Sequence, residues 1–461
     1  MLNRHSPSVS GAAGISFAVA LGVRLIVSYG FLGEMPMVSD AESYAGEATA
    51  WQASFPPERS LFWPPGNPLV LALASQLLGP DVAFRLTPVV LSALTAPLIV
   101  FFAAEIGASR RTSFVAGLLW AVYPPAILLA GQSYAQHLSA LCLVSFALAG
   151  AATLRTGRAA WALAAGAALG LGALTRPAML SLIAALLVGL VIALRRRRQD
   201  TAGPGARQLF FSTILAISAT AALLLPIMLH NYQHGAGLTL STNNERNLFL
   251  GNNPHTPDYK TSHLGQRSLE ELPPEVRSYL QYFYDLPDSR RAMQAEAVKY
   301  MVENPARTLK RTLSRLRAFW GFDYLGSRII QAHFGLSNKA LYPLLLFEAG
   351  AYSLIVFLFL AGLFLPASMC CCEGPTQPSL AWVLVLIVAF QAPYLIAFSA
   401  GTYHFPVLPL LLPWSARALL ALSQGDQAAR YLLRRPMFLF ALAVFVAIQL
   451  EYGLRTLDGG I

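Results

Sequence analysis

Long apolar segments recur along this chain, and they restrict its fold more than any other feature. Each approaches the roughly 20 residues that an α-helix needs to cross a bilayer. Because hydrocarbon offers no partners for backbone N–H and C=O groups, such segments fold as helices. Eleven are expected, near residues 15–32, 82–106, 112–129, 135–154, 159–174, 178–194, 209–229, 341–365, 380–397, 407–422 and 437–452. The predicted fold class is an all-α polytopic membrane protein with a mixed, mainly helical external loop region.

The composition agrees with a chain that is solvated mainly by lipid. Of its 461 residues, 55% are apolar and 12% are charged, whereas soluble domains carry about 25% charged residues. The net charge of +10 comes mainly from basic residues at segment ends and in one long loop, without an RNA- or DNA-binding motif. We interpret them as topology signals and contacts to anionic membrane lipids, and expect no nucleic-acid partner.

The four cysteines match neither a zinc site nor a disulfide framework. Cys142 lies inside an apolar segment, and Cys370, Cys371 and Cys372 follow another. Acylation of these three thiols and a chance cluster at a membrane edge are both open.

Short basic clusters predict the orientation, since cytoplasmic loops are enriched in Lys and Arg. A cytoplasmic N-terminus places every strong cluster inside: residues 110–111, 155–158, 195–198 and 434–435. The first segment has no small-residue cleavage site after it and is expected to be a retained helix.

This orientation divides the chain into three parts. Residues 1–229 form an N-terminal transmembrane module with a first external loop at 33–66. Residues 230–340 form a large external loop region, and residues 341–461 form C-terminal transmembrane helices.

The first external loop carries the most chemically suggestive pattern. Ser39 and Glu42 have the S-x-x-E form of a capping box, which predicts that a helix begins here. Glu42 is expected to bond back to the Ser39 amide. On that helix one face carries two carboxylates and two aromatic rings, from Asp40, Tyr44, Glu47 and Trp51.

The large loop has organisation of its own. Residues 231–254 are rich in Asn and Gly and predict turns with many free side-chain amides. Residues 288–319 have a helical pattern that Asn304–Pro305 interrupts. The second part is basic and amphipathic, and is expected to lie along the lipid interface with its basic side chains toward headgroup phosphates. The residues expected to point inward are Leu309, Leu313, Leu316 and Trp320.

Five short motifs occur in one order along residues 12–422, and together they resemble the GT-C glycosyltransferases. The nearest resemblance is to the bacterial protein-mannosyltransferase-like branch, which includes the aminoarabinose transferases of lipid A. The motifs are D-x-x-x-Y (40–44), an aromatic-P-P-G-x-P-L stretch (62–69), L-T-R-P (174–177), N-L-x-x-G-N-N-P (247–254) and Y-x-x-P-x-L-P (403–409).

The resemblance implies a multi-pass enzyme of the bacterial inner membrane with an external, periplasmic active site. It would move a sugar from a polyprenyl-phosphate donor to a lipid, polysaccharide or protein acceptor. By resemblance Asp40 is the catalytic carboxylate, and the chemistry independently needs a base, because a hydroxyl is a poor nucleophile at neutral pH. The alternative is that Asp40 only favours the helix N-terminus electrostatically.

The phosphate leaving group needs cationic donors at the membrane surface. Arg176 fits because it ends a helix on the same side as Asp40, although it could simply snorkel to headgroups. Arg246 and His404 are secondary candidates. Tyr44 and Glu47, on the Asp40 face, are candidates for substrate contact or for packing.

Many relatives carry a second acid at the external start of the fourth helix, where this chain has Gln136 followed by His137. Both could bond sugar hydroxyls or phosphate. A divalent ion would have to rely on Asp40, Glu42 and Glu47, and hard cations want several oxygen ligands. We therefore expect a reaction without metal or other cofactor. A single displacement would invert the anomeric carbon, which NMR assignment of the product would test.

Two other classes remain open. A transporter or flippase of lipid-linked sugars would also have many helices, but neither an internal repeat nor mid-membrane charges are evident. The third reading is a non-catalytic protein that binds a lipid carrier or a partner.

Overall fold

The computed structural model describes residues 8–33, 35–197, 203–259, 264, 267–366 and 377–458, and these contain helices but no strand. Cys370, Cys371 and Cys372 lie outside the described residues. The N-terminal elements are α1 (Val9–Leu25), η1 (Ile26–Phe31), α2 (Asp40–Ala53), α3 (Gly66–Leu78), α4 (Pro80–Glu105), α5 (Arg110–Ala121), α6 (Pro124–Leu128), α7 (Gln136–Thr156), α8 (Ala159–Thr175), η2 (Pro177–Ser181), α9 (Leu182–Arg197) and α10 (Ala206–Gln233). The large loop contains α11 (Asn244–Gly251), η3 (Leu269–Glu271), α13 (Pro274–Tyr284), α14 (Ser289–Glu303), α15 (Pro305–Phe319) and α16 (Leu325–Phe334). The C-terminal elements are α17 (Asn338–Phe364), α18 (Gln377–Ile396), η5 (Gly401–Val407), α19 (Leu408–Leu422), α20 (Asp426–Leu433) and α21 (Pro436–Asp458).

The predicted membrane architecture is confirmed, with two segments that differ from simple spans. Within the described ranges, nine helices are long and apolar enough to cross a bilayer. The predicted segment at residues 112–129 is a bent pair, α5 and α6, with an angle of 49° between the two helices. The predicted segment at residues 159–174 is α8, an apolar helix of 17 residues.

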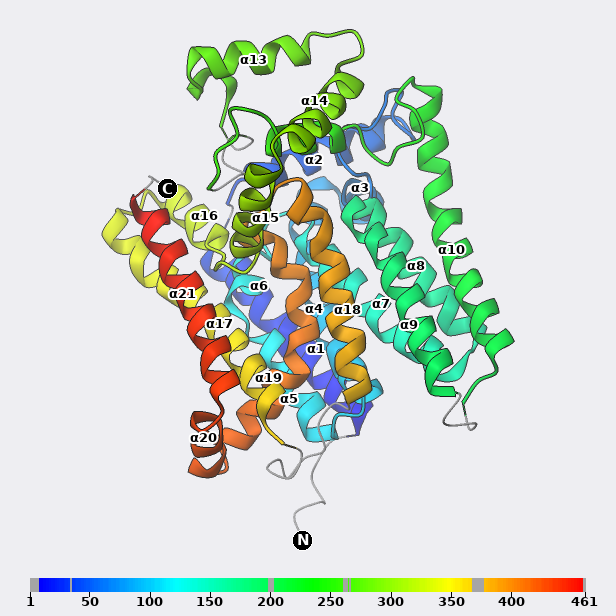
Figure 1. Cartoon of the computed structure of the whole chain (residues 1–461), viewed down its shortest axis with the longest axis vertical. Helices are drawn as coiled ribbons and strands as arrows, with labels where there is room; N and C mark the ends of the chain where they lie inside the picture. Colours follow the sequence, from blue (N-terminus) through cyan, green and yellow to red (C-terminus); the bar gives the residue numbers. More distant parts are fainter. Residues whose placement is uncertain are drawn as a thin grey trace.

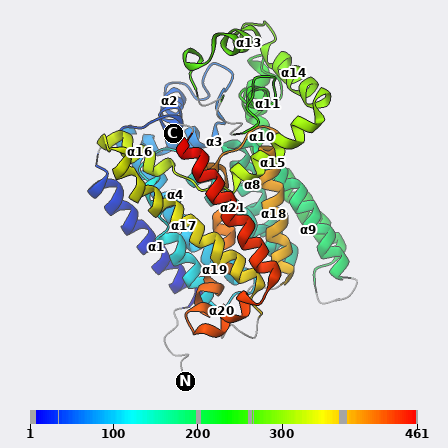
Figure 2. The ribbon, with the colours of Figure 1, turned by 60° about the vertical axis from the view of Figure 1, so that its left-hand side comes forward.

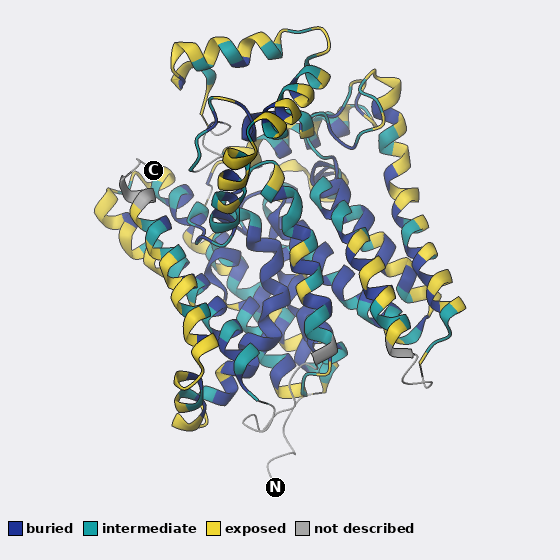
Figure 3. Ribbon diagram, viewed as in Figure 1, coloured by how far each residue is buried: buried dark blue, intermediate teal, exposed yellow. Residues whose placement is uncertain are grey.

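The spans surround α19, which the C-terminal part of the chain inserts among N-terminal helices. α19 packs against α4, α5, α7 and α17, and 89% of the most apolar stretch of the span that it forms with η5, Gly401–Leu422, is buried. Figure 3 shows buried residues concentrated on these central helices and exposed residues along α21 and α10. The exposed residues on the outer spans are largely apolar, as expected for surfaces that face lipid.

Small residues allow α8 to lie tightly between α7 and α10. α8 is rich in Ala and Gly, and a Cβ at Gly166 would collide with the Ala216 carbonyl oxygen of α10. In lipid, where burial of apolar surface gives little driving force, close helix approach through small residues supplies the packing energy.

The break between α5 and α6 is compensated by a buried charge. Pro124 and Pro125 open α6, so the last carbonyl groups of α5 lack helical partners. Arg24 of α1 is fully buried and donates to the carbonyl oxygens of Trp120 and Ala121 at 3.0 and 2.9 Å. A positive charge at the C-terminal end of a helix is also favoured by the helix dipole.

The α15 helix is oriented differently from the expectation. Leu309 and Leu313 are 61% and 58% exposed, which suits a lipid-facing side, but Arg311 and Arg315 are buried in the protein and do not face headgroups. Arg315 donates to the carbonyl oxygens of Leu395 and Ile396, the end of α18, at 3.1 and 2.7 Å.

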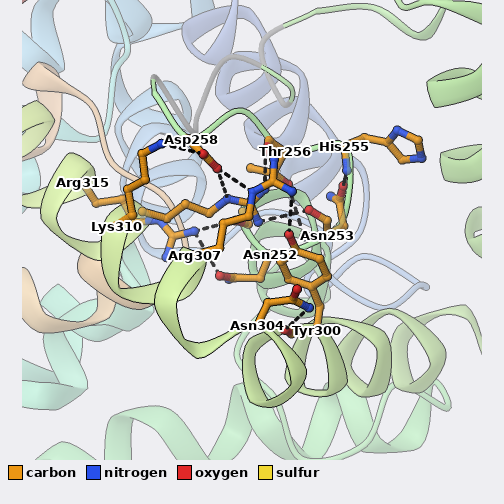
Figure 4. A network of polar contacts seen from close by, with 12 residues as sticks. Asn252, Asn253, His255, Thr256, Asp258, Tyr300, Asn304, Arg307, Lys310 and Arg315 are labelled. Atoms are coloured by element: carbon orange, nitrogen blue, oxygen red, sulfur yellow. Dashed lines mark hydrogen bonds and ion pairs between the residues drawn. The ribbon is translucent and has the colours of Figure 1, made fainter.

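The same two arginines hold the N-L-x-x-G-N-N-P motif against the membrane domain. Arg315 also bonds the Gly251 carbonyl oxygen and the Asn252 side chain, and Arg311 bonds the Asn253 and Thr256 carbonyl oxygens. Figure 4 shows this network, in which residues 252–258 meet one face of α15. The amides expected to be free in this segment are therefore largely used for structure.

Charged groups also occur within the spans, which corrects the expectation that charges lie only at segment ends. Glu348 of α17 accepts the Gly326 and Ser327 amide hydrogens at 3.1 and 2.8 Å, at the start of α16. Arg417 of α19 donates to the Leu365 carbonyl oxygen at 2.7 Å, at the end of α17. Each of these charges meets a helix end, so their placement is structural.

We expect Arg315→Met to lower the free energy of unfolding by about 3 kcal/mol, because several buried carbonyl groups would lose their donor at roughly 1–3 kcal/mol each. The melting temperature of the purified protein measures this loss. Lys299→Met, on the exposed side of α14, is the control that removes a charge without removing a buried donor. Equal melting temperatures for the two variants would contradict the structural role of Arg315.

Candidate active site

The site begins with a short segment without regular secondary structure, residues 35–39, which we call the strap. It leads from the first span to α2 and is held by groups from α4 and from the loop between α6 and α7. Arg85 donates to the Gly33 and Met35 carbonyl oxygens at 2.7 and 3.1 Å. Arg85 thereby fixes Met35, at the beginning of the strap, and Gly33 just before it.

Gln132 and Tyr134 fix the second half of the strap. The fully buried Gln132 side chain accepts the Val38 amide hydrogen at 3.3 Å and donates to the Pro36 carbonyl oxygen at 3.0 Å. Tyr134 donates its hydroxyl hydrogen to the Val38 carbonyl oxygen at 3.1 Å. The Gln132 amide therefore bonds the strap much as a neighbouring strand would.

Ser39 follows in an uncommon backbone conformation. Its φ of 56° is the only positive value at a non-glycine residue within the described ranges. Such conformations cost free energy and are found where surrounding contacts impose them. The helix begins at Asp40 as predicted, but the capping box does not form, because Ser39 makes no side-chain cap bond.

Asp40 and Arg176 lie close enough to influence each other, without forming an ion pair. The Asp40 side chain is exposed to solvent yet crowded by protein, and burial raises its pKa while the Arg176 charge lowers it. In the part of the chain that the structure describes, no carboxylate lies within 4.0 Å of the Arg176 guanidinium. The two charges are thus electrostatically coupled at a separation greater than that of an ion pair.

Tyrosines and one serine surround Arg176. Its guanidinium carbon lies 5.4 Å from the Tyr403 ring centroid, and its Nε donates to the Ser139 hydroxyl oxygen at 3.2 Å. The Tyr394 ring stacks on that of Tyr403 at 4.9 Å. Tyr44 is buried and electrostatically coupled to both Asp40 and Arg176, and burial raises its pKa, so that its hydroxyl stays neutral.

The aromatic-P-P-G and L-T-R-P motifs meet at this point. Gly66 begins α3 directly against Thr175, and a Cβ at position 66 would lie 2.6 Å from the Thr175 amide nitrogen. Only glycine allows this approach. Asn67 donates to the Ser133 carbonyl oxygen at 2.8 Å, which ties α3 to the loop carrying Tyr134.

The other predicted residues are distributed around this centre. Glu47 forms a two-oxygen ion pair with Arg59 at 2.9 Å. Glu42 is exposed. Within the described residues, no group of three or more His, Cys, Asp or Glu side chains is placed to hold a metal ion.

The two histidines lie in packed environments. His404 is buried, stacks on Tyr352 at 4.2 Å and its Nδ1 bonds the Phe319 carbonyl oxygen at 2.8 Å. His137 is fully buried beside Phe405. Gln136 is buried, and its Oε1 makes no hydrogen bond.

Arg246 lies on α11, between two aromatic rings. Its guanidinium carbon is 5.9 Å from the Phe62 ring centroid and 5.3 Å from that of Tyr284. Arg246 is not among the charges that shift the pKa of Asp40. It therefore occupies a different place from Arg176.

The sequence did not point to every residue of this cluster. Tyr403 opens the last motif, and Tyr134 lies two residues before the predicted site residue Gln136. Tyr394 and Gln132 had no distinguishing signal, because a tyrosine or glutamine near the end of an apolar helix is ordinary.

Comparisons with known proteins agree with this architecture. Residues 60–240 match the family model for dolichyl-phosphate-mannose-protein mannosyltransferases. The structure is similar to that of AglB, an oligosaccharyltransferase from Archaeoglobus fulgidus in complex with an inhibitory peptide and a dolichol-phosphate, with a TM-score of 0.50, 12% identity, and coverage of 95% of this chain and 54% of AglB. No curated protein sequence matches the chain.

Two further structures show weaker similarity. The protein O-mannosyltransferase Pmt1–Pmt2 complex of S. cerevisiae bound to the sugar donor has a TM-score of 0.40 and 14% identity, covering 50% of this chain and 35% of that one. ArnT from Cupriavidus metallidurans in the apo state has a TM-score of 0.38 and 16% identity, covering 88% and 78%. The chain thus spans about a third to a half of the first two structures. The family match and the similarity to AglB agree with the predicted resemblance to the GT-C glycosyltransferases, and the predicted multi-pass membrane fold is confirmed.

We expect Gln132→Met to loosen the strap, because the Val38 amide hydrogen loses its acceptor while side-chain volume is nearly kept. Amide hydrogen exchange at Val38 should become about fivefold faster, corresponding to the loss of a hydrogen bond worth about 1 kcal/mol. Gln449→Met, which removes a similar bond from α21 to Trp320, serves as the matched control. Unchanged exchange at Val38 in Gln132→Met would show that the amide does not hold the strap.

Proposed function

We propose that this protein is a glycosyltransferase of the bacterial inner membrane, which moves a sugar from a polyprenyl-phosphate donor to an acceptor on the external face. The observation that carries the proposal is the pairing of Asp40 with Arg176 without an ion pair. This reaction needs two charged groups, a base for the acceptor and a cation for the leaving phosphate. Asp40 and Arg176 are two such groups, and they are electrostatically coupled.

In the proposed reaction Asp40 acts as general base. It accepts the proton of the acceptor hydroxyl while that oxygen bonds to the anomeric carbon of the sugar. The bond between the anomeric carbon and the phosphate oxygen breaks, and its electron pair leaves with the polyprenyl phosphate. One displacement without a protein nucleophile inverts the anomeric configuration.

Arg176 is the group that would bind the departing phosphate. Its guanidinium is held by Ser139 and by the face of Tyr403, neither of which neutralises its charge. Preorganised cationic donors stabilise charge that develops in a transition state without having to reorganise. Tyr394 and Tyr44, which are electrostatically coupled to Arg176, can add neutral hydroxyl donors to phosphate or sugar oxygens.

The basic clusters support an external active site. They favour a cytoplasmic position for the loop between α4 and α5 and for the Arg155–Glu105 ion pair at 2.6 Å. In chain order, Asp40 and Arg176 both fall at the other ends of the spans, away from these clusters. The charged side chains Arg24, Glu348 and Arg417 within the spans are hydrogen-bonded to backbone groups at helix ends, so they give no support to a transport pathway.

We expect Asp40→Asn to abolish sugar transfer, because an amide cannot take the acceptor proton. Transfer is measured with membranes and a radiolabelled polyprenyl-phosphate sugar, and the untransferred donor should accumulate in cells that carry this variant. Since burial disfavours the charged form of Asp40, the melting temperature should stay the same or rise. Glu42→Gln, an exposed change two residues away, controls for lost charge. Full transfer by Asp40→Asn would remove the proposed mechanism.

The pH dependence follows from the pKa of Asp40, which burial raises and Arg176 partly lowers. The base must be ionised, so kcat/KM should fall as the pH drops through a value above that of an ordinary aspartate. Arg176→Met removes the opposing charge and should move this acid limb to higher pH. Profiles of kcat/KM against pH measure both effects, and a limb that moves to lower pH in Arg176→Met would contradict the coupling.

A further inference from the structure

Arg246 is a preorganised cation that the proposed chemistry at Asp40 does not use. Its side chain is half-buried between the rings of Phe62 and Tyr284. Its Nε approaches the Tyr284 hydroxyl oxygen at 3.4 Å, which is a long bond. The rings restrict the guanidinium plane and leave its terminal N–H groups available.

No acidic group of the described chain pairs with Arg246. The neighbouring Glu245 is already bonded to Arg290 at 2.6 Å. Several other arginines of the large loop are satisfied by protein oxygens, as Arg307 is by Asp258 at 2.7 Å and Arg311 is by backbone carbonyl groups. Arg246 is half-buried, and its terminal nitrogens have no such bond among the residues described.

The start of α11 adds to the positive potential around Arg246. The N-cap residue Asn243 makes no side-chain cap bond, and its buried Oδ1 has no hydrogen-bond partner. The first N–H groups of a helix lack intrahelical partners and carry partial positive charge. An oxyanion near Arg246 would therefore meet two kinds of donor, the guanidinium and the first turn of the helix.

A row of aromatic rings connects this place with the reaction centre. The Phe62 ring lies 5.3 Å from that of Trp63, and Trp63 lies 5.5 Å from Tyr44. Tyr44 is in turn coupled to Asp40. Phe62 and Trp63 are partly exposed, and flat apolar rings of this kind suit the apolar faces of sugars.

The donor phosphate does not belong at Arg246. That phosphate is bonded to the anomeric carbon, which must lie next to the hydroxyl that Asp40 deprotonates. The phosphate therefore has to bind near Asp40, where Arg176 is the coupled cation and Arg246 is not. An anion at Arg246 has to come from the other substrate.

We propose that Arg246, flanked by Phe62 and Tyr284, binds an oxyanion carried by the acceptor, so that the acceptor is an anionic sugar compound. Phosphate and carboxylate groups share the required chemistry, because both accept two N–H bonds from one guanidinium. The aromatic row then carries the adjoining sugar toward Asp40. This inference rests on the proposed function where it identifies the bound compound as the acceptor. Binding at Arg246 itself can be tested without any sugar transfer.

The test measures binding of small probes to the full-length purified protein by calorimetry. The probes are methyl glucoside 6-phosphate, methyl glucuronoside, neutral methyl glucoside and inorganic phosphate. We expect an anionic sugar to bind about tenfold more tightly than the neutral one. The preferred anionic probe shows whether the acceptor group is a phosphate or a carboxylate, and weaker binding of inorganic phosphate shows that the sugar contributes.

Variants locate the bound anion. Arg246→Met should abolish the preference for the anionic probe, and Arg246→Lys should keep only part of it, since a point charge cannot make the paired bonds. Arg291→Met removes a charge from an exposed arginine of α14 that pairs only with Asp288, and should change nothing. Arg176→Met and Asp40→Asn should also retain the preference.

Two results would overturn the inference. One is equal binding of anionic and neutral probes by the unmodified protein. The other is a preference that Arg176→Met removes and Arg246→Met does not, which would place the anion at the reaction centre. If Asp40→Asn proves fully active while Arg246 still governs probe binding, the proposed reaction fails and the anion site stands.

Discussion

Unpaired carbonyl groups at helix ends inside a low-dielectric medium are the constraint on which this structure depends. A bilayer cannot satisfy them, so the protein must. Arg24, Arg315 and Arg417 each meet the end of a helix, namely α5, α18 and α17. The guanidinium group suits this task because it presents several donors from one side chain. Part of the basic composition, interpreted from sequence as orientation signals, is in fact used to join helices.

Hydrogen bonds of this kind also help to assemble the candidate active site from distant parts of the chain. Arg315 connects the large loop to the end of α18, and the same helix carries Tyr394, which stacks on Tyr403 beside Arg176. Figures 1 and 2 show the large-loop helices α11, α13 and α14 above the same end of the bundle that α2 covers. The site therefore joins residues of α2, α7, α18 and η5, and the contact between α15 and α18 helps to hold them together.

The sequence was sufficient for features that depend on local pattern and insufficient for those that depend on partners. Apolar length predicted the spans, and the order of five motifs predicted the resemblance; the structure then brings two of these motifs together at Gly66 and Thr175. The amphipathic pattern of α15 identified the helix correctly but not the burial of Arg311 and Arg315, because the acceptors are backbone carbonyl groups that no sequence pattern reveals. Gln132 was missed for the same reason, since it recognises the backbone of the strap.

The left-handed backbone of Ser39 has a consequence for how the protein is made. A serine does not keep this conformation in a free chain. The Asp40 side chain is therefore oriented only after Gln132 and Tyr134 have formed their hydrogen bonds to the strap. Those two residues are synthesised about ninety positions later and lie beyond two further spans. A chain whose synthesis or insertion stops before them carries the carboxylate without its orientation. The candidate active site thus takes its final geometry only when the membrane insertion of the following helices is complete.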